Sequence, residues 1–170
     1  MTSLVLTVIA PDKPGLVEQL SQTIASNKGN WLESSMSRLA GKFAGILTVS
    51  VPDAQADTLL EALQKLESQG MKVIAERSSE ATTPTDSNSI TLELIGHDKP
   101  GIVREISQAL SRYNINVERL STELVSGSMS AELLFKADAD LTVPAGVDLD
   151  DLQQSLEGIA NDLMVDITLN

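Results

Sequence analysis

The chain has 170 residues, of which 42% are apolar and 21% charged, so its composition is that of a folded globular protein. Its 24 Asp and Glu residues outnumber 12 Lys and Arg residues, and the net charge of −12 argues against direct binding to nucleic acid or an anionic membrane. There is no cysteine and one histidine, which excludes thiol catalysis, disulfides and multi-histidine metal sites. Neither a signal peptide nor an apolar run of about 18 residues is evident, so we expect a cytoplasmic protein. We also expect no cofactor.

The first 77 residues alternate between patterns typical of strands and of helices. Leu4–Ala10 is a short apolar run that ends at a proline, which predicts a buried strand. The next segment has apolar residues at the 3.6-residue spacing of an amphipathic helix. We expect a hairpin around Gly41, and then a helix that Asp53 caps and Gly70 ends. The expected elements are Leu4–Ala10, Pro14–Lys28, Trp31–Leu39, Phe43–Val51, Asp53–Gln69 and Met71–Arg77.

Residues 78–89 carry mostly hydroxyl and charged side chains and one proline, which is the composition of a linker. The same order of elements then returns, with a longer segment, Asp138–Leu149, before its last helix. The expected elements are Ile90–Gly96, Pro100–Tyr113, Asn116–Ser126, Met129–Ala137, Asp150–Asp162 and Leu163–Leu169.

The two halves are copies of one module. With a displacement of 86 residues, Leu6–Asn30 aligns with Leu92–Asn116 without a gap, and 10 of the 25 positions are identical. We therefore expect a module over residues 1–77, the linker over 78–89 and a second module over 90–170. A β-α-β-β-α-β unit of this size predicts an α+β, ferredoxin-like fold, in which both helices cover one face of an antiparallel sheet. The other face is free for a partner.

The tetrapeptide Asp-Lys-Pro-Gly lies between the first strand and first helix of each copy, at residues 12–15 and 98–101. One interpretation is structural: Asp12 caps the helix and Pro14 stands in its first turn. The other is functional, because a helix N-terminus presents free N–H groups to a carboxylate, and a nearby aspartate can hold an ammonium group. Together these groups form a small receptor for an α-amino acid.

Asn30 and Asn116 stand at the start of the second expected strand of each copy. Each is either a turn residue after its helix or a carboxamide that offers a donor and an acceptor to a ligand. We expect the Asp and the Asn of a module to lie near one another, since the first strand ends and the second begins on the same side of the sheet.

This pattern of strand, Asp-Lys-Pro-Gly, amphipathic helix and Asn resembles the ACT domain, a regulatory module that binds small molecules. A tandem pair with such loops resembles the group of glycine cleavage system transcriptional repressors. The resemblance implies that an amino-acid effector binds between two ACT modules, where the first loop of one faces the second strand of the other. The implied ligand-binding residues are Asp12, Pro14, Gly15, Leu16, Asn30, Asp98, Pro100, Gly101, Ile102 and Asn116.

The residues do not favour a catalytic, a calcium-binding or an RNA-binding site. A catalytic dyad of His97 and Asp98 lacks a third member, and adjacent loop residues rarely adopt relay geometry. A calcium loop that starts at Asp138 would need an acid at Leu149, so we expect a solvated acidic loop with Asp148 or Asp150 as a helix cap. An RNA-binding surface needs aromatic and basic residues, and this acidic chain has only four aromatic residues.

We therefore expect a non-catalytic protein without a metal site, which senses a small amino acid, glycine among them, and regulates transcription through a protein partner. A stand-alone regulatory subunit of a metabolic enzyme, and a scaffold that has lost ligand binding, remain alternatives. A homodimer is compatible with either. Acidic residues are densest in Asp138–Asp151, which is where a basic partner would dock.

Overall fold

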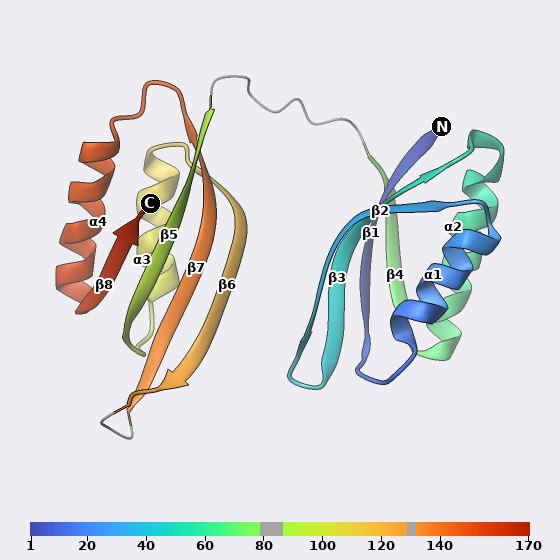
Figure 1. Cartoon of the computed structure of the whole chain (residues 1–170), viewed down its shortest axis with the longest axis horizontal. Helices are drawn as coiled ribbons and strands as arrows, with labels where there is room; N and C mark the ends of the chain where they lie inside the picture. Colours follow the sequence, from blue (N-terminus) through green and yellow to red (C-terminus); the bar gives the residue numbers. More distant parts are fainter. Residues whose placement is uncertain (79–86, 129–131) are drawn as a thin grey trace. The chain divides into compact units, whose positions relative to one another are not determined.

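The computed structural model describes residues 1–78, 87–128 and 132–170, which form two compact units, one from each copy of the repeat (Figure 1). The division between the units falls after residue 81. This position belongs to the expected linker over 78–89, of which residues 79–86 lie outside the described part of the chain. No helix among the described residues has the length and hydropathy needed to cross a membrane.

The first unit is a four-stranded antiparallel sheet with its helices on one face (Figure 1). The strand order is β2-β3-β1-β4, so the α+β, ferredoxin-like prediction is confirmed. Its elements are β1 (Thr2–Pro11), α1 (Leu16–Ser26), β2 (Asn30–Leu39), β3 (Lys42–Val51), the 3₁₀ turn η1 (Asp53–Gln55), α2 (Ala56–Lys65), the 3₁₀ turn η2 (Leu66–Gln69) and β4 (Lys72–Arg77).

The second unit has the same architecture, with the strand order β6-β7-β5-β8. Its strand β5 begins at Ser87, and its strand β7 continues to Pro144, so both are longer than expected. The start of the expected strand Met129–Ala137 lies in residues 129–131, outside the described part. Its elements are β5 (Ser87–His97), α3 (Ile102–Arg112), β6 (Asn116–Ser126), β7 (Leu133–Pro144), α4 (Leu149–Leu163) and β8 (Val165–Leu169).

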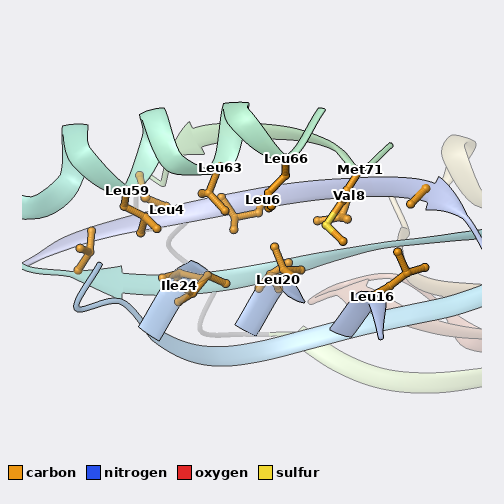
Figure 2. Close-up of a cluster of buried hydrophobic side chains, with 14 of the residues drawn as sticks. Leu4, Leu6, Val8, Leu16, Leu20, Ile24, Leu59, Leu63, Leu66 and Met71 are labelled. Atoms are coloured by element: carbon orange, nitrogen blue, oxygen red, sulfur yellow. The ribbon is translucent and has the colours of Figure 1, made fainter. Parts of the chain in front are cut away.

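Each core lies between the helices and one face of the sheet. In the first unit, alternate residues of β1 point toward the helices, where Leu6 meets the leucines of α2 and Leu20 and Ile24 of α1 fill the other side (Figure 2). These side chains are almost completely buried, and each contributes roughly 1.5–3 kcal/mol on transfer from water. The apolar stripes seen in the sequence are therefore the core faces of the helices.

Two turns of the first unit confirm predictions, and one cap does not. Ala40 and Gly41 have φ values of 50° and 76°, which makes a two-residue hairpin turn with the twist of the strands. Gly70, with φ of 92°, ends the second helical segment as expected. Asp53 caps no helix: the hydroxyl of Thr2 donates to its carboxylate at 2.7 Å, and the N-terminal amine lies 3.3 Å away. The carboxylate thus binds the start of the chain.

The acidic segment of the second unit is partly a strand, so the expectation of a solvated loop over Asp138–Leu149 is wrong for its first half. Residues of β7 alternate, with Ala139 and Leu141 buried under the helices and Asp138 and Asp140 on the open face. Because Asp138 and Asp140 are residues typical of loops, the alternation of polar and apolar residues in this strand was not recognised. The expected cap is confirmed, since the Asp148 carboxylate accepts the N–H of Asp150 at 2.9 Å.

Candidate functional site

Each Asp-Lys-Pro-Gly loop ends in a glycine that begins the following helix. Gly15 and Gly101 are the N-caps of α1 and α3, and their φ values of 90° and 94° lie in the left-handed region that favours glycine. Among the described residues, no side chain forms a capping hydrogen bond at either helix start. The interpretation of Asp12 as the cap is therefore wrong, because the left-handed glycine takes the cap position three residues later. Pro14 precedes the cap and does not stand in the first turn.

The two helices start in the same way. The carbonyl oxygen of Gly15 accepts the N–H of Gln19 at 3.0 Å, and that of Gly101 accepts the N–H of Glu105 at the same distance. The N–H groups of the first turn, beginning at Leu16 and Ile102, lie before these bonds and receive no side-chain cap. Each loop thus presents backbone donors and the positive end of a helix dipole, which suit a carboxylate.

Each aspartate is hydrogen-bonded to the end of the sheet at which the third strand of its module, β3 or β7, begins. The N–H of Asp12 donates to the carbonyl oxygen of Gly41 at 3.0 Å, and the N–H of Asp98 donates to that of Leu133 at 3.2 Å. The Asp12 carboxylate lies 3.5 Å from the guanidinium of Arg38 and is 30% exposed. Within the described part of the chain, the Asp98 carboxylate has no ion-pair partner.

The corresponding strand positions explain this difference. Arg38 is opposite Phe43 in the first sheet, and Leu124 is opposite Phe135 in the second. The second module therefore has an aliphatic side chain where the first has a cation. A ligand ammonium group would meet a carboxylate that is paired with Arg38 in the first loop and one without an ion-pair partner among the described residues in the second.

The two asparagines lie far from the loops of their own modules. Asn30 is opposite Ser50 of β3, and Ser50 is opposite Ser3 of β1, so Asn30 is level with the start of β1. Asp12 follows the end of β1. The expectation that Asp and Asn approach one another within a module is therefore wrong, because β1 and β2 both run antiparallel to β3 and are parallel to each other.

The same holds in the second module, where Asn116 is opposite Thr142 and Thr142 is opposite Ser89, at the start of β5. There the asparagine belongs to a small polar network that was not predicted. Its amide donates to the carboxylate of Glu118 at 2.7 Å, and the Thr142 hydroxyl donates to the same oxygen at 2.8 Å. The bond from Asn116, followed by that from Thr142, lowers the pKa of Glu118.

A β-bulge brings Glu118 to this position. The register of β6 against β7 shifts by one residue between Val117 and Arg119, and that of β2 against β3 shifts between Trp31 and Ser34. The two bulges occupy similar places after the asparagines. Alternation of apolar and polar residues does not reveal a bulge in strands as exposed as these, so sequence reasoning had no signal for Glu118.

His97 ends β5, and its Nδ1 lies 3.0 Å from a carboxylate oxygen of Glu132. The structure thus pairs this histidine with a residue of the β7 side and not with the adjacent Asp98. Across the described ranges, no three His, Asp or Glu residues converge in a way that could hold a metal ion.

Comparison with known proteins identifies the modules. Residues 2–75 match a family model described as the ACT domain, and residues 90–135 match a second model with the same description. The glycine cleavage system transcriptional repressors of Escherichia coli (strain K12) and Shigella flexneri are each 22% identical over 173 residues, which cover 98% of this chain and 88% of the relative. A UPF0237 protein of Methanocaldococcus jannaschii is 34% identical over 79 residues, which cover 45% of this chain and 88% of that protein.

Solved structures show the same fold along the whole chain. A protein from Galdieria sulphuraria, described only as unknown, has a TM-score of 0.84 at 25% identity and covers 99% of this chain and 97% of that one. A candidate glycine cleavage system transcriptional repressor has a TM-score of 0.70 at 20% identity, over 99% of this chain and 96% of that one.

Proposed function

The chain belongs to the ACT-domain family, with two ACT domains, and we propose that it is a non-catalytic cytoplasmic regulator that senses a small amino acid. Glycine is the first candidate ligand, because the similar repressors of E. coli and S. flexneri are named for the glycine cleavage system. The bound protein would regulate transcription of amino-acid metabolism through a protein partner.

One observation carries the proposal: both modules keep an uncapped helix start behind a left-handed glycine, three residues after an aspartate. An α-amino acid has a carboxylate for the N–H groups that follow Gly15 and Gly101, and an ammonium group for Asp12 or Asp98.

The asparagines could contact a ligand only from a different module than the loop that holds it. Because Asn30 and Asn116 are at the far end of their own sheets, neither can touch a ligand held by the loop of its own module. Their role as ligand contacts depends on a second ACT domain, as the family resemblance implies. This part stays a prediction.

The test is calorimetry of the full chain with each of the twenty amino acids. We expect saturable heat for glycine or another small amino acid, and a raised melting temperature at saturating ligand. Asp98→Asn should weaken this binding, and Asp151→Asn, an exposed carboxylate at the opposite end of the second module, serves as the matched control. If no amino acid gives heat or moves the melting transition, the sensor function is wrong.

Negative charge on the second sheet supports a basic protein as the partner. The open face of this sheet gathers carboxylates from several strands: Glu93, Glu123, Asp138, Asp140 and Asp166. Cations share this face as well: Arg119, whose Nε lies 2.7 Å from Asp140, and Lys136, which stands opposite Glu123. Glu93 stands directly opposite Asp138, an arrangement of like charges that costs free energy in the free protein. A basic surface on a partner would relieve that repulsion.

The alternative function is a regulatory subunit of a metabolic enzyme, which the same ACT domains would serve equally well. Affinity capture with the full chain, with and without the bound amino acid, distinguishes the two. Recovery of a transcription factor supports the repressor role, and recovery of an enzyme supports the alternative. Charge-reducing substitutions at Glu93 and Asp138 should reduce either capture, whereas Asp57→Asn on the first module should not.

A further inference from the structure

The second module contains an apolar groove that the proposed function does not use. It lies between α3 and the edge strand β6, on the side of the sheet that faces the helices, with a cavity volume of about 50 Å³. Leu94, Ile106 and Phe135 line its inner part, and Val103, Val117 and Leu120 line its mouth. These last three side chains are 46%, 41% and 52% exposed, so the groove is open to solvent.

The groove arises from two substitutions between the modules. Val117 is opposite Leu141 of β7, and its counterpart Trp31 is opposite Val49 of β3. The Trp31 side chain packs half-buried against the core of the first module. The second module thus has a valine where the first inserts an indole ring.

The second substitution lies deeper in the sheet. Ala139 is opposite Leu120, and its counterpart Leu47 is opposite Ser34. Leu47 is 1% exposed and fills the first core, whereas Ala139 leaves that space open. Leu120 replaces only part of the lost volume, because it stands half in solvent at the mouth.

The lining selects for hydrocarbon. Of the described residues that line the groove, Ser107 alone is polar, and its hydroxyl donates to the carbonyl oxygen of Arg104 at 3.0 Å, within its own helix. The volume is several times the roughly 10–15 Å³ that one water needs, but a water there would have no polar partners. An enclosed apolar cavity of about 150 Å³ stays dry and binds benzene, so this smaller groove, open at its mouth, would take an aromatic ring only in part.

We propose that this groove binds the aromatic ring of a small molecule, with any polar part of that molecule left in solvent at the mouth. The first module supports the aromatic class, because its own polypeptide supplies an indole at the matching strand position. The site differs from the loop of Asp98, although Ile102 belongs to both: its side chain lines the groove, whereas the amino acid would meet its N–H group at the start of α3. The two proposals can fail independently.

The test uses indole as the probe and methyl NMR of the full chain. We expect saturable shifts in the methyl signals of Val117, Leu120 and Ala139 as indole is added. Val117→Trp, which copies the first module, should fill the groove and abolish these shifts. Ile95→Trp adds the same ring to the open face of the same sheet and should leave them intact, since Ile95 points away from the helices.

If Val117→Trp does not fold, Ala139→Leu fills the inner part of the groove with the residue that the first module carries. The proposal is overturned if indole gives no saturable shift up to its solubility limit. It is overturned equally if the shifts persist in whichever filled variant folds. Unchanged glycine binding in the filled variants would show that the groove and the loop are separate sites.

Discussion

The carboxylate of Asp12 lies 3.5 Å from the guanidinium of Arg38, whereas no cation among the described residues forms an ion pair with the matching Asp98. The two loops share a tetrapeptide and a backbone conformation, yet they differ in charge. A ligand ammonium group must compete with Arg38 in the first module only. The modules are therefore expected to bind amino acids with unequal affinity.

Exchanging Arg38 and Leu124 between the modules should reverse which loop binds an amino acid more tightly. Leu124→Arg places a cation near Asp98, and should weaken amino-acid binding at the second loop. Arg38→Leu frees Asp12, and should strengthen binding at the first. Two-site calorimetry with glycine measures both. Equal effects of the two substitutions on both sites would contradict a role for these aspartates.

Replacement of the loop glycines should cost stability whether or not a ligand binds. Gly15→Ala and Gly101→Ala place a side chain at φ values of 90° and 94°, for which we expect a loss of about 1–2 kcal/mol each in urea unfolding. Gly158→Ala is the control, since Gly158 lies inside α4 with nothing within 4 Å of an added Cβ. That substitution should stabilise the protein by roughly 0.5–1 kcal/mol.

The asparagine substitutions separate a ligand contact from a structural one. If the family geometry applies, Asn30→Ala and Asn116→Ala should each weaken amino-acid binding, measured by calorimetry, while both proteins remain folded by circular dichroism. Unchanged affinity in both variants would leave these residues with structural roles alone, which for Asn116 is the bond to Glu118.

The bond from Asn116 also predicts a titration. Hydrogen bonds from Asn116 and Thr142 lower the pKa of Glu118 in the folded protein, so their contribution is present above the unfolded pKa and is lost as the pH falls through the folded one. Asn116→Ala should move the pKa of Glu118 upward, toward its ordinary value. An NMR titration of the side-chain carboxyl carbon measures this. In Asn30→Ala the pKa of Glu118 should not move.

Repulsion across the second sheet predicts a dependence on salt. Glu93 and Asp138 are directly opposite on the open face, so Glu93→Gln should raise the melting temperature of the second module in dilute buffer. The gain should shrink as salt is added, because counterions screen exposed charges. A gain that is independent of salt would indicate a cause other than charge.

The order and type of the elements could be predicted because the modules repeat and their core faces follow regular spacing. The stripe through Leu20 and Ile24 predicted α1, and the hairpin turn at Gly41 is where a glycine predicted it. Strand β7 was cut short because Asp138 and Asp140 resemble loop residues, although their neighbours alternate into the core.

The candidate site was harder to predict, because it depends on backbone conformation and on the relative direction of the strands, which the spacing of residue types does not show. Asp12 looked like a helix cap until the left-handed φ of Gly15 moved the cap to the glycine itself. The separation of Asp12 from Asn30 follows from the parallel course of β1 and β2, which the residues alone do not reveal. The groove beside Val117 depends on side-chain volumes at matched positions of the two sheets, which a repeat of apolar residues does not distinguish.

The two modules share the sequence of their loops, but the open faces of their sheets carry different types of residue. On the first sheet, Ile46 and Ile74 flank Thr7 in one row, whereas the matching surface of the second sheet carries carboxylates. We therefore expect apolar contacts on the first face to persist at high salt, and attraction to the charges of the second face to weaken as salt shortens the Debye length from about 10 Å at 0.1 M. The salt dependence of a complex therefore distinguishes binding to the open face of the second sheet from binding to that of the first.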